Sequence, residues 1–233
     1  MIPEYHHALI IGAGEGLSAS LARLFRDKGL RLSLAARNAS KLTALCDEIG
    51  ATAYACDASD ASSVNALFEA LDNTPGGAPD VVVYNPSARQ RGPIAELDAD
   101  AVLAALKITA YGGFLVSQQA VRRMLPLGQG AILFTGASAS VKGYPQSAPF
   151  AMGKFALRGL AESLAREVQP QGIHVAHFVI DGAIRNPGRE NPADKPDSLL
   201  DPQAIALTYW QTLKQDRSAW ANEIALRPWL ERF

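Results

Sequence analysis

Cysteine and histidine are scarce in this chain, and their scarcity excludes two kinds of site. Only two cysteines, Cys46 and Cys56, and four histidines occur among the 233 residues. No cluster of these residues has the spacing of a metal site, and two cysteines cannot build the disulfide framework of a small secreted protein. We therefore expect neither a bound metal ion nor structural disulfides.

An excess of charge of one sign is also missing. The chain has 22 lysines and arginines against 23 acidic residues. Nucleic-acid-binding proteins carry a basic stripe and membrane-surface helices a basic face, so neither partner is expected. The N-terminus does not read as a secretion signal, and no run approaches the roughly 20 apolar residues of a membrane span. These absences predict a cytoplasmic protein.

What the sequence does contain is a regular alternation of short apolar runs with amphipathic stretches. The apolar runs predict buried strands at 7–14, 31–37, 51–57, 79–85, 130–138 and 173–180. The amphipathic stretches predict helices at 17–29, 39–50, 61–73, 98–125 (one long helix or two closely spaced ones) and 148–170. Buried strands joined by helices indicate a parallel sheet covered on both faces. We predict one doubly wound, Rossmann-type, three-layer α/β domain over residues 1–233.

One segment, 181–202, fits no regular element. It holds four of the chain's 14 prolines and many polar residues. It follows a strand at the end of the sheet where such folds bind ligands, and it is long for a connector. A substrate lid is the favoured interpretation, and a flexible surface insertion is the alternative.

A glycine-rich turn joins the first strand to its helix. Gly12, Gly14 and Gly16 precede Leu17, which opens the helix. Glycines there allow a tight turn and let backbone N–H groups approach a pyrophosphate at the helix N-terminus. The four residues are therefore candidates for binding a dinucleotide, although a tight strand-to-helix turn alone would use the same glycines.

Two charged residues close the second and third predicted strands. Arg37 stands where an acidic residue would bind the ribose of NAD, and an arginine there suits the 2′-phosphate of NADP(H). A surface or helix-capping arginine is the alternative. Asp57 is a candidate acceptor for the adenine amino group, for the N-cap of the next helix, or for both.

Together with the order of elements, these motifs resemble the short-chain dehydrogenase/reductase family along essentially the whole chain. The glycine turn at 12–16 resembles the family's Gly-x-x-x-Gly-x-Gly, and Asp57 its adenine-site aspartate. Asn85 in "YNPSA" matches the first residue of the family's Asn-Asn-Ala-Gly. Lys154 matches the active-site lysine, and Gly182 in "IDGAI" the glycine of a Pro-Gly motif. The resemblance implies that these residues bind the cofactor.

The family's catalytic Asn, Ser and Tyr are replaced or ambiguous. Thr109 falls at the asparagine position, Ala137 or Ser138 at the serine, and Phe150 at the tyrosine. The pattern is similar to an atypical family branch with Phe four residues before the lysine. In the family's mechanism, NADPH gives a hydride to a carbonyl while the tyrosine, whose pKa the lysine lowers, protonates the oxygen. Lys154 and Ser138 are thus the candidate catalytic residues, with Phe150 in the tyrosine's place.

A missing general acid typically costs about 10²–10⁴-fold in rate, so a substitute is expected. Tyr144, Tyr111 and Tyr84 are the tyrosines to consider. Packing is the favoured interpretation of each, and Tyr144 is the best candidate among them for a substitute acid. Lys154 could itself act through a water. The leading hypothesis is an NADP-dependent oxidoreductase acting on a small carbonyl or alcohol, assembled as a homodimer or homotetramer as the resemblance implies. The alternative is a weak or inactive NADP-binding protein with a sensor or structural role.

Overall fold

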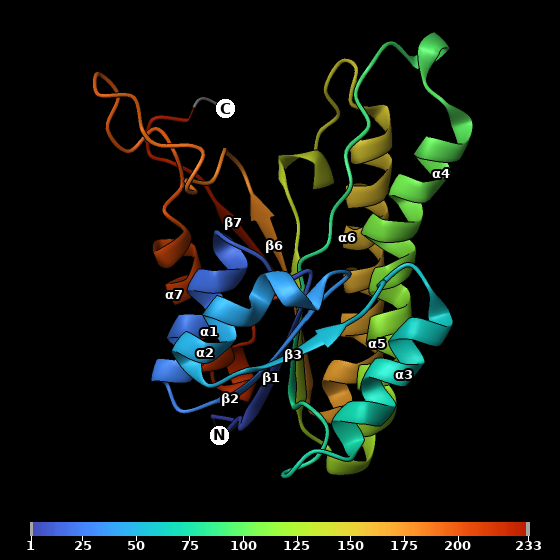
Figure 1. Ribbon diagram of the computed structural model, residues 1–233, viewed down its shortest axis with the longest axis vertical. Coiled ribbons are helices and arrows are strands. Elements are labelled where there is room, and N and C mark those ends of the chain that lie inside the picture. The colour runs from blue at the N-terminus through green and yellow to red at the C-terminus, as the bar shows by residue number, and fades with distance from the viewer. Residues whose placement is uncertain (1, 232–233) are drawn as a thin grey trace.

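The computed structural model describes residues 2–231 and contains a seven-stranded parallel sheet (Figure 1). Its strands are β1 (His7–Ile11), β2 (Arg31–Ala36), β3 (Thr52–Ala55), β4 (Val81–Tyr84), β5 (Gly130–Thr135), β6 (Ile173–Ile180) and β7 (Glu223–Leu226). Their order across the sheet is β3-β2-β1-β4-β5-β6-β7. The direction of winding reverses between β1 and β4, and in such sheets ligands bind at that switch point, beyond the carboxyl ends of the strands.

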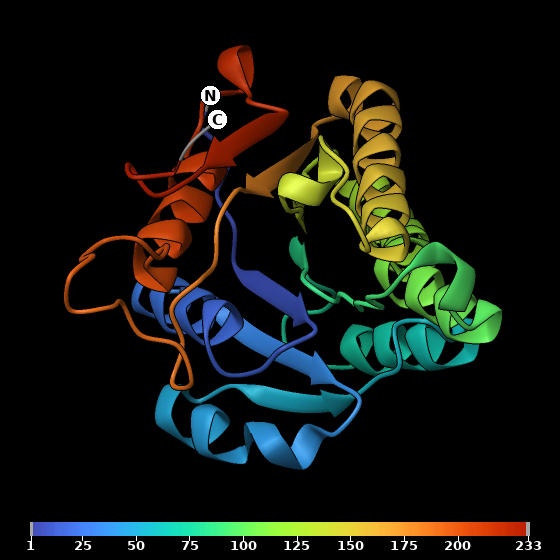
Figure 2. The ribbon, with the colours of Figure 1, turned by 90° about the horizontal axis from the view of Figure 1, so that it is seen from above.

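Helices cover both faces of the sheet (Figures 1 and 2). One face carries α1 (Leu17–Asp27), α2 (Thr43–Ile49) and α7 (Pro202–Leu213), and the other α3 (Ala61–Asp72), α4 (Ala99–Leu106), α5 (Gly112–Met124) and α6 (Ala148–Val168). The predicted doubly wound, Rossmann-type α/β domain is confirmed.

Most strand residues are apolar because successive side chains enter two different cores. In β1, Ala8 and Ile10 pack beneath α1 and α7, whereas Leu9 and Ile11 pack beneath α3, α5 and α6. A strand buried on both faces has no solvent-facing side that would require polar residues. The same logic explains the unbroken apolar run of β4, all of whose residues are buried.

Most predicted strands and helices are shorter in the structure, and two elements show the clearest differences. The predicted strand 51–57 is reduced to the four residues of β3, which lies at the sheet edge, and the predicted helix 39–50 starts as a 3₁₀ turn at Ala39–Leu42 before α2. The stretch 98–125 is one continuous helical path, in which a π-helical segment, Lys107–Tyr111, joins α4 to α5.

That helical path corrects one expectation drawn from the sequence. Ala99–Leu127, which contains an 18-residue window with a mean hydropathy of 1.4, is long and apolar enough to cross a membrane by length and composition alone. A core helix of a globular protein passes the same test, so the signal is weak. Here α4 packs on α6, and α5 packs on α3, β4 and β5.

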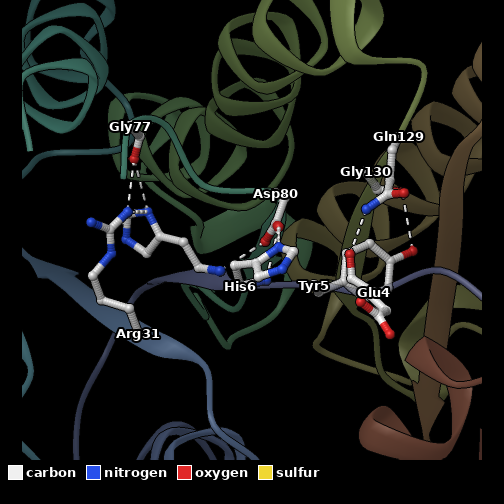
Figure 3. A network of polar contacts seen from close by, with 9 residues as sticks. Glu4, Tyr5, His6, Arg31, Gly77, Asp80, Gln129 and Gly130 are labelled. Carbon is white, nitrogen blue, oxygen red and sulfur yellow. Dashed lines mark hydrogen bonds and ion pairs between the residues drawn. The ribbon is translucent and has the colours of Figure 1, made fainter. Parts of the chain in front are cut away.

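A polar network fixes the amino ends of the strands, opposite the expected site (Figure 3). The Asp80 carboxylate accepts hydrogen bonds from the backbone N–H groups of His6 and His7, at 2.8 and 2.9 Å. Arg31 donates to the Gly77 carbonyl at 2.9 Å. The strand starts are thereby held in register, and the carboxyl ends carry the open loops.

The segment 181–202 leaves β6 and reaches α7 along an irregular path (orange in Figure 1). Two isolated β-bridges, Ile184 with Leu200 and Asn186 with Arg189, hold it together. The C-terminal stretch supplies β7; residues 232 and 233 lie outside the described part.

Candidate active site

Two adjoining cavities open at the carboxyl ends of the strands. The first, about 1090 Å³, is walled by the ends of β1 and β2 and by the loops after β3 and β4; we call it the β2 cavity. The second, about 880 Å³, lies between the ends of β5 and β6, the start of α6 and the segment 181–202; we call it the β5 cavity. Glu15, Asn85 and Ser87 line both, so the cavities form one groove across the switch point.

The glycine turn lies where the two cavities meet. Gly12 has a φ of +75°, and a Cβ there would approach the Pro86 nitrogen to 2.8 Å, so both backbone and space require glycine. Gly12 and Gly14 line the β2 cavity, and Gly16 and Leu17 the β5 cavity. Gly16 is the N-cap of α1, which has no side-chain cap and no acidic residue in its first turn. The helix therefore presents uncapped N–H groups suited to an anion.

Ser18, which replaces the last glycine of the family motif, ties this turn to the loop after β4. Its hydroxyl donates to the Gly12 carbonyl at 3.2 Å and accepts a hydrogen bond of 2.7 Å from the Asn85 amide. The substitution thus fixes Asn85 at the junction of the two cavities.

The far wall of the β2 cavity carries the charged residues predicted from the strand ends. Arg37 lines it together with Asn38 and Lys41, a second cation that the sequence patterns did not single out. Asp57 lines it too and accepts from the backbone N–H and hydroxyl of Ser59, at 2.9 and 2.6 Å. The Ser59 hydroxyl, then its N–H, lower the pKa of Asp57, so the carboxylate stays ionised.

The structure rejects one alternative for Asp57. The N-cap of α3 is Asp60, whose carboxylate accepts from the N–H groups of Ser62 and Ser63. Asp57 closes the turn before that cap and faces the cavity. A volume above 1000 Å³, an uncapped helix N-terminus, two cations and a fixed carboxylate together fit a dinucleotide with an additional phosphate.

Lys154 is the central group of the β5 cavity. It lies on α6, is 2% exposed, and donates a 2.7 Å hydrogen bond from Nζ to the Thr135 carbonyl at the end of β5. Burial, and next the nearby Arg89 guanidinium, lower its pKa from 10.5 to about 7. Gly153 allows α6 to pack tightly here, because a Cβ would meet the Thr109 side chain at 3.0 Å.

Phe150 lies one helical turn before Lys154 and forms part of the cavity wall. The Arg89 guanidinium sits over its ring, 4.3 Å from the centroid. Arg89 belongs to the loop after β4 and was not singled out from the sequence. Phe150 is thus an aromatic ring in the cavity wall with a cation on its face.

The remaining predicted residues of the β5 cavity occupy its rim. Ser138 and Ala137 both line it, and of the two only Ser138 brings a hydroxyl. The neighbouring Ser140 is buried and accepts from the Ala137 N–H, at 3.1 Å. Tyr144 also lines the cavity, with its ring 5.6 Å from the Lys142 ammonium. Ser138 and Tyr144 are thus brought to the same space as Lys154.

Three other candidates are not brought into either cavity. Tyr84 is buried, and its hydroxyl donates to the Ile108 carbonyl at 2.5 Å. Tyr111 is exposed and stacks on Phe114. Thr109 is buried and accepts from the Ala88 N–H at 3.1 Å. Tyr84 and Tyr111 are therefore wrong as substitute acids, and Thr109 anchors the loop after β4.

The loop after β6 completes the cavity. Gly182 has a φ of +152°, and a Cβ there would approach Pro228 to 2.9 Å. Asp181 is buried, with its carboxylate 3.5 Å from Lys142 and 3.6 Å from Arg227. Asp181 therefore ties the loop after β6 to the loop after β5, through Lys142, and to the C-terminal stretch, through Arg227.

Sequence reasoning missed the arginines of the β5 cavity. Arg89 and Arg91 lie only a few residues after Asn85, in "YNPSARQR", and Arg189 comes from the irregular segment. Two arginines without an acidic neighbour, directly after a strand end at the switch point, were the available signal. That signal identifies the arginines, but it does not reveal that Arg89 stacks on the ring of Phe150.

Comparison with known proteins agrees with this architecture. The model of the short chain dehydrogenase family matches residues 6–191. D-threitol dehydrogenase of Mycolicibacterium smegmatis is 31% identical over 72% of this chain, and the match spans 66% of that protein, just under two thirds of its length.

Solved structures give the same result over nearly the full chain. The crystal structure of a short-chain dehydrogenase from Rhodopseudomonas palustris shares 35% identity with a TM-score of 0.82, covering 97% of this chain and all of the other. A metagenomic short-chain oxidoreductase, crystallised with NADP, shares the fold at 23% identity, with a TM-score of 0.84 and coverage of 97% and 98%. This chain belongs to the short-chain dehydrogenase family of oxidoreductases.

Proposed function

We propose that this protein is an NADP-dependent oxidoreductase that interconverts a small carbonyl compound and its alcohol, with the proton supplied by a group other than the usual tyrosine. The supporting observation is Lys154, a buried lysine with a pKa of about 7, in a cavity that adjoins the glycine turn. When bound, the nicotinamide cofactor supplies the hydride chemistry.

The groove fits such a cofactor at both ends. Backbone N–H groups at Gly14, Gly16 and Leu17 would hold the pyrophosphate at the start of α1. Arg37 and Lys41 would bind a 2′-phosphate, and this pair supports NADP(H) over NAD(H). The remaining proposed contacts are Gly12, Asp57, Asn85, Lys154 and Gly182. NADP itself is bound in the metagenomic oxidoreductase of the same fold.

Two groups in the β5 cavity could donate the proton. A general acid works best with a pKa near the operating pH, which favours Lys154 Nζ. Tyr144 is the second candidate, because it carries a hydroxyl and lines the same cavity as Lys154. Ser138 would orient the substrate oxygen, which takes the proton from Lys154 Nζ as its carbon accepts the hydride.

The proposal extends to the lid and the assembly. Segment 181–202 would act as a lid, since several of its residues line the β5 cavity. Exposed apolar side chains on α4 and α6, including Leu103, Met152 and Phe155, favour a homodimer or homotetramer built across these helices. A cytoplasmic location fits the fold of this enzyme family.

A second function, NADP binding without turnover in a sensor or structural role, is favoured by one observation. Phe150 has no hydroxyl, and the Thr109 hydroxyl already accepts a hydrogen bond from the backbone N–H of Ala88. Under that hypothesis the cavities would bind cofactor and Lys154 would only position it.

One experiment separates the two functions. NADPH and NADH are titrated by thermal shift, and NADPH oxidation is then followed against a panel of small carbonyl compounds with wild type, Lys154→Met and Tyr144→Phe. Turnover by wild type that Lys154→Met abolishes supports the proposal with Lys154 as donor; loss in Tyr144→Phe alone moves the role to Tyr144. Cofactor binding without turnover favours the second function, and no stabilisation by either cofactor contradicts both.

A further inference from the structure

We propose that Arg89, Arg91 and Arg189 form an anion site in the β5 cavity, and that the substrate carries a carboxylate or phosphate group that this site holds. The inference rests on the proposed function and deepens it by naming the class of substrate, an acidic carbonyl compound or the corresponding hydroxy acid or phosphate ester. Phe150 is the positioning residue for Arg89.

Arg89 is placed by an aromatic ring instead of an ion pair. Its guanidinium lies over Phe150 at 4.3 Å from the ring centroid. Stacking on a ring face leaves the N–H donors around the edge of the guanidinium plane free to bind an acidic group in a bidentate manner. The ring thus presents a cation to the cavity without neutralising it.

The three arginines come together from two separate loops. Arg89 and Arg91 follow β4, whereas Arg189 belongs to the segment 181–202, and all three line the β5 cavity. Partial burial lowers the pKa of Arg89, and the positive charges of Arg91 and Arg189 lower it further. The three positive charges are therefore within reach of one another. Like charges gathered in one cavity repel, and an anion between them removes that repulsion.

Nearby acidic groups do not satisfy these arginines. Among residues 2–231, no ion pair includes Arg89, Arg91 or Arg189. The contrast with their neighbours is clear, because Arg185 pairs with Asp201 at 3.0 Å and Asp181 lies near Lys142 and Arg227.

Two carboxylates, Glu15 and Glu231, also line the β5 cavity. Neither forms an ion pair with the three arginines. The cluster therefore keeps its positive charge facing the cavity.

The position of the cluster points to substrate and not to cofactor phosphate. Of the phosphate-binding features of the groove, the Arg37–Lys41 pair lines only the β2 cavity, whereas the start of α1 reaches the β5 cavity through Gly16 and Leu17. The three arginines line only the β5 cavity, with Lys154 and Ser138. An acidic group held there would place the rest of a small substrate beside the proposed proton donor, and would connect the segment 181–202 to the loop after β4.

The test measures anion binding directly and needs no turnover. Full-length protein is saturated with NADP⁺, which blocks the cofactor phosphate sites, and titrated calorimetrically with oxamate as the carboxylate probe and inorganic phosphate as the phosphate probe. Methyl oxamate is the uncharged match. Wild type is compared with Arg89→Ala, Arg89→Lys and Phe150→Leu. Arg122→Ala serves as the control, because Arg122 is an exposed arginine in the last turn of α5, outside both cavities.

We expect wild type and Arg122→Ala to bind one of the two anions and not the ester. Arg89→Ala should weaken that binding about 10-fold or more, since a charged hydrogen-bonding group is lost. Arg89→Lys and Phe150→Leu should each give a smaller loss, because charge is kept in one and the aromatic platform is removed in the other. The anion that binds identifies carboxylate or phosphate as the group recognised.

Three results overturn the inference: no binding of either anion, binding that Arg89→Ala leaves unchanged, or a loss of NADP⁺ affinity in Arg89→Ala, which would assign the arginines to the cofactor. Failure of wild type to bind NADP⁺ contradicts the proposed function instead. In that case the same titrations on cofactor-free protein still decide whether Arg89 binds an anion.

Discussion

The Lys154 side-chain nitrogen donates a 2.7 Å hydrogen bond to the backbone carbonyl of Thr135 and is paired with no carboxylate among the described residues. A carbonyl partner cannot offset the cost of burying a full positive charge, and Arg89 adds repulsion. At neutral pH the lysine is therefore close to its pKa and readily loses its proton.

The first prediction concerns the pH dependence of turnover. Carbonyl reduction needs Lys154 protonated, so kcat/KM for reduction should fall as pH rises through about 7. Alcohol oxidation needs the neutral amine and should rise over the same range. Initial rates in both directions from about pH 6 to about pH 9 test this. Parallel or flat profiles would remove Lys154 as the proton donor.

The second prediction concerns stability. The folded-state pKa of Lys154, about 7, lies below its ordinary 10.5, so between these values the unfolded chain binds more protons and stability increases with pH. At pH 7 nearly the whole cost of the buried lysine is present. Lys154→Met should therefore stabilise the cofactor-free protein at pH 7 by roughly 2–4 kcal/mol, after allowing for the lost hydrogen bond.

Urea unfolding of wild type and Lys154→Met at pH 7 and at pH 9 measures this difference. The gap between the two proteins should narrow at the higher pH, because the wild-type lysine then costs less. A variant that is less stable than wild type at pH 7 would show that Lys154 is favourably paired in the folded protein.

The third prediction concerns cofactor choice. Arg37→Ala should weaken NADPH binding by about 10-fold, because a charged hydrogen bond to the 2′-phosphate is lost, and should leave NADH binding within about twofold. Lys41→Ala should act in the same direction. Binding of both cofactors is measured by fluorescence titration. Arg23→Ala is the control variant, because Arg23 is a surface arginine that pairs with Glu48. Equal losses for NADPH and NADH would place Arg37 outside the phosphate site.

The fourth prediction concerns assembly. Phe155 is 44% exposed on α6, which also exposes Met152, and the packed helix α4 exposes Leu103. Phe155→Glu should dissociate the proposed oligomer, because a buried unpaired charge is costly at an interface. Leu127→Glu, at an equally apolar but separate exposed position, is the control. Light scattering that gives a monomer for wild type would contradict the prediction.

The fold followed from the sequence because its signals are local. Continuous apolar runs such as β4, and helix ends such as Gly50, identify elements without any knowledge of their neighbours. The edge strand β3 was predicted too long because it makes few contacts that would extend it. The apolar character of Ala99–Leu127 was underestimated, because charged residues such as Asp100 and Lys107 interrupt its apolar run.

The site was less predictable because its chemistry depends on contacts between distant segments. The residues of the glycine turn, Arg37 and Asp57 could be placed from strand ends alone. Gly12, Gly14, Arg37 and Asp57 line the β2 cavity, and Gly16 and Leu17 line the adjoining β5 cavity. By contrast, Tyr84 was considered as an acid because its position in the chain does not reveal that its hydroxyl meets Ile108. Arg89 gains its meaning only from the ring of Phe150, 61 residues further along the chain.

The central claim, that this site turns over without the tyrosine hydroxyl, is tested most directly by comparing kcat for NADPH oxidation in wild type and Phe150→Tyr with the same carbonyl substrate. We expect measurable turnover by wild type and a change of less than about 10-fold in the variant, because Lys154 already supplies the proton. An inactive wild type with a gain of about 100-fold or more in Phe150→Tyr, the contribution of a newly positioned general acid, would contradict it.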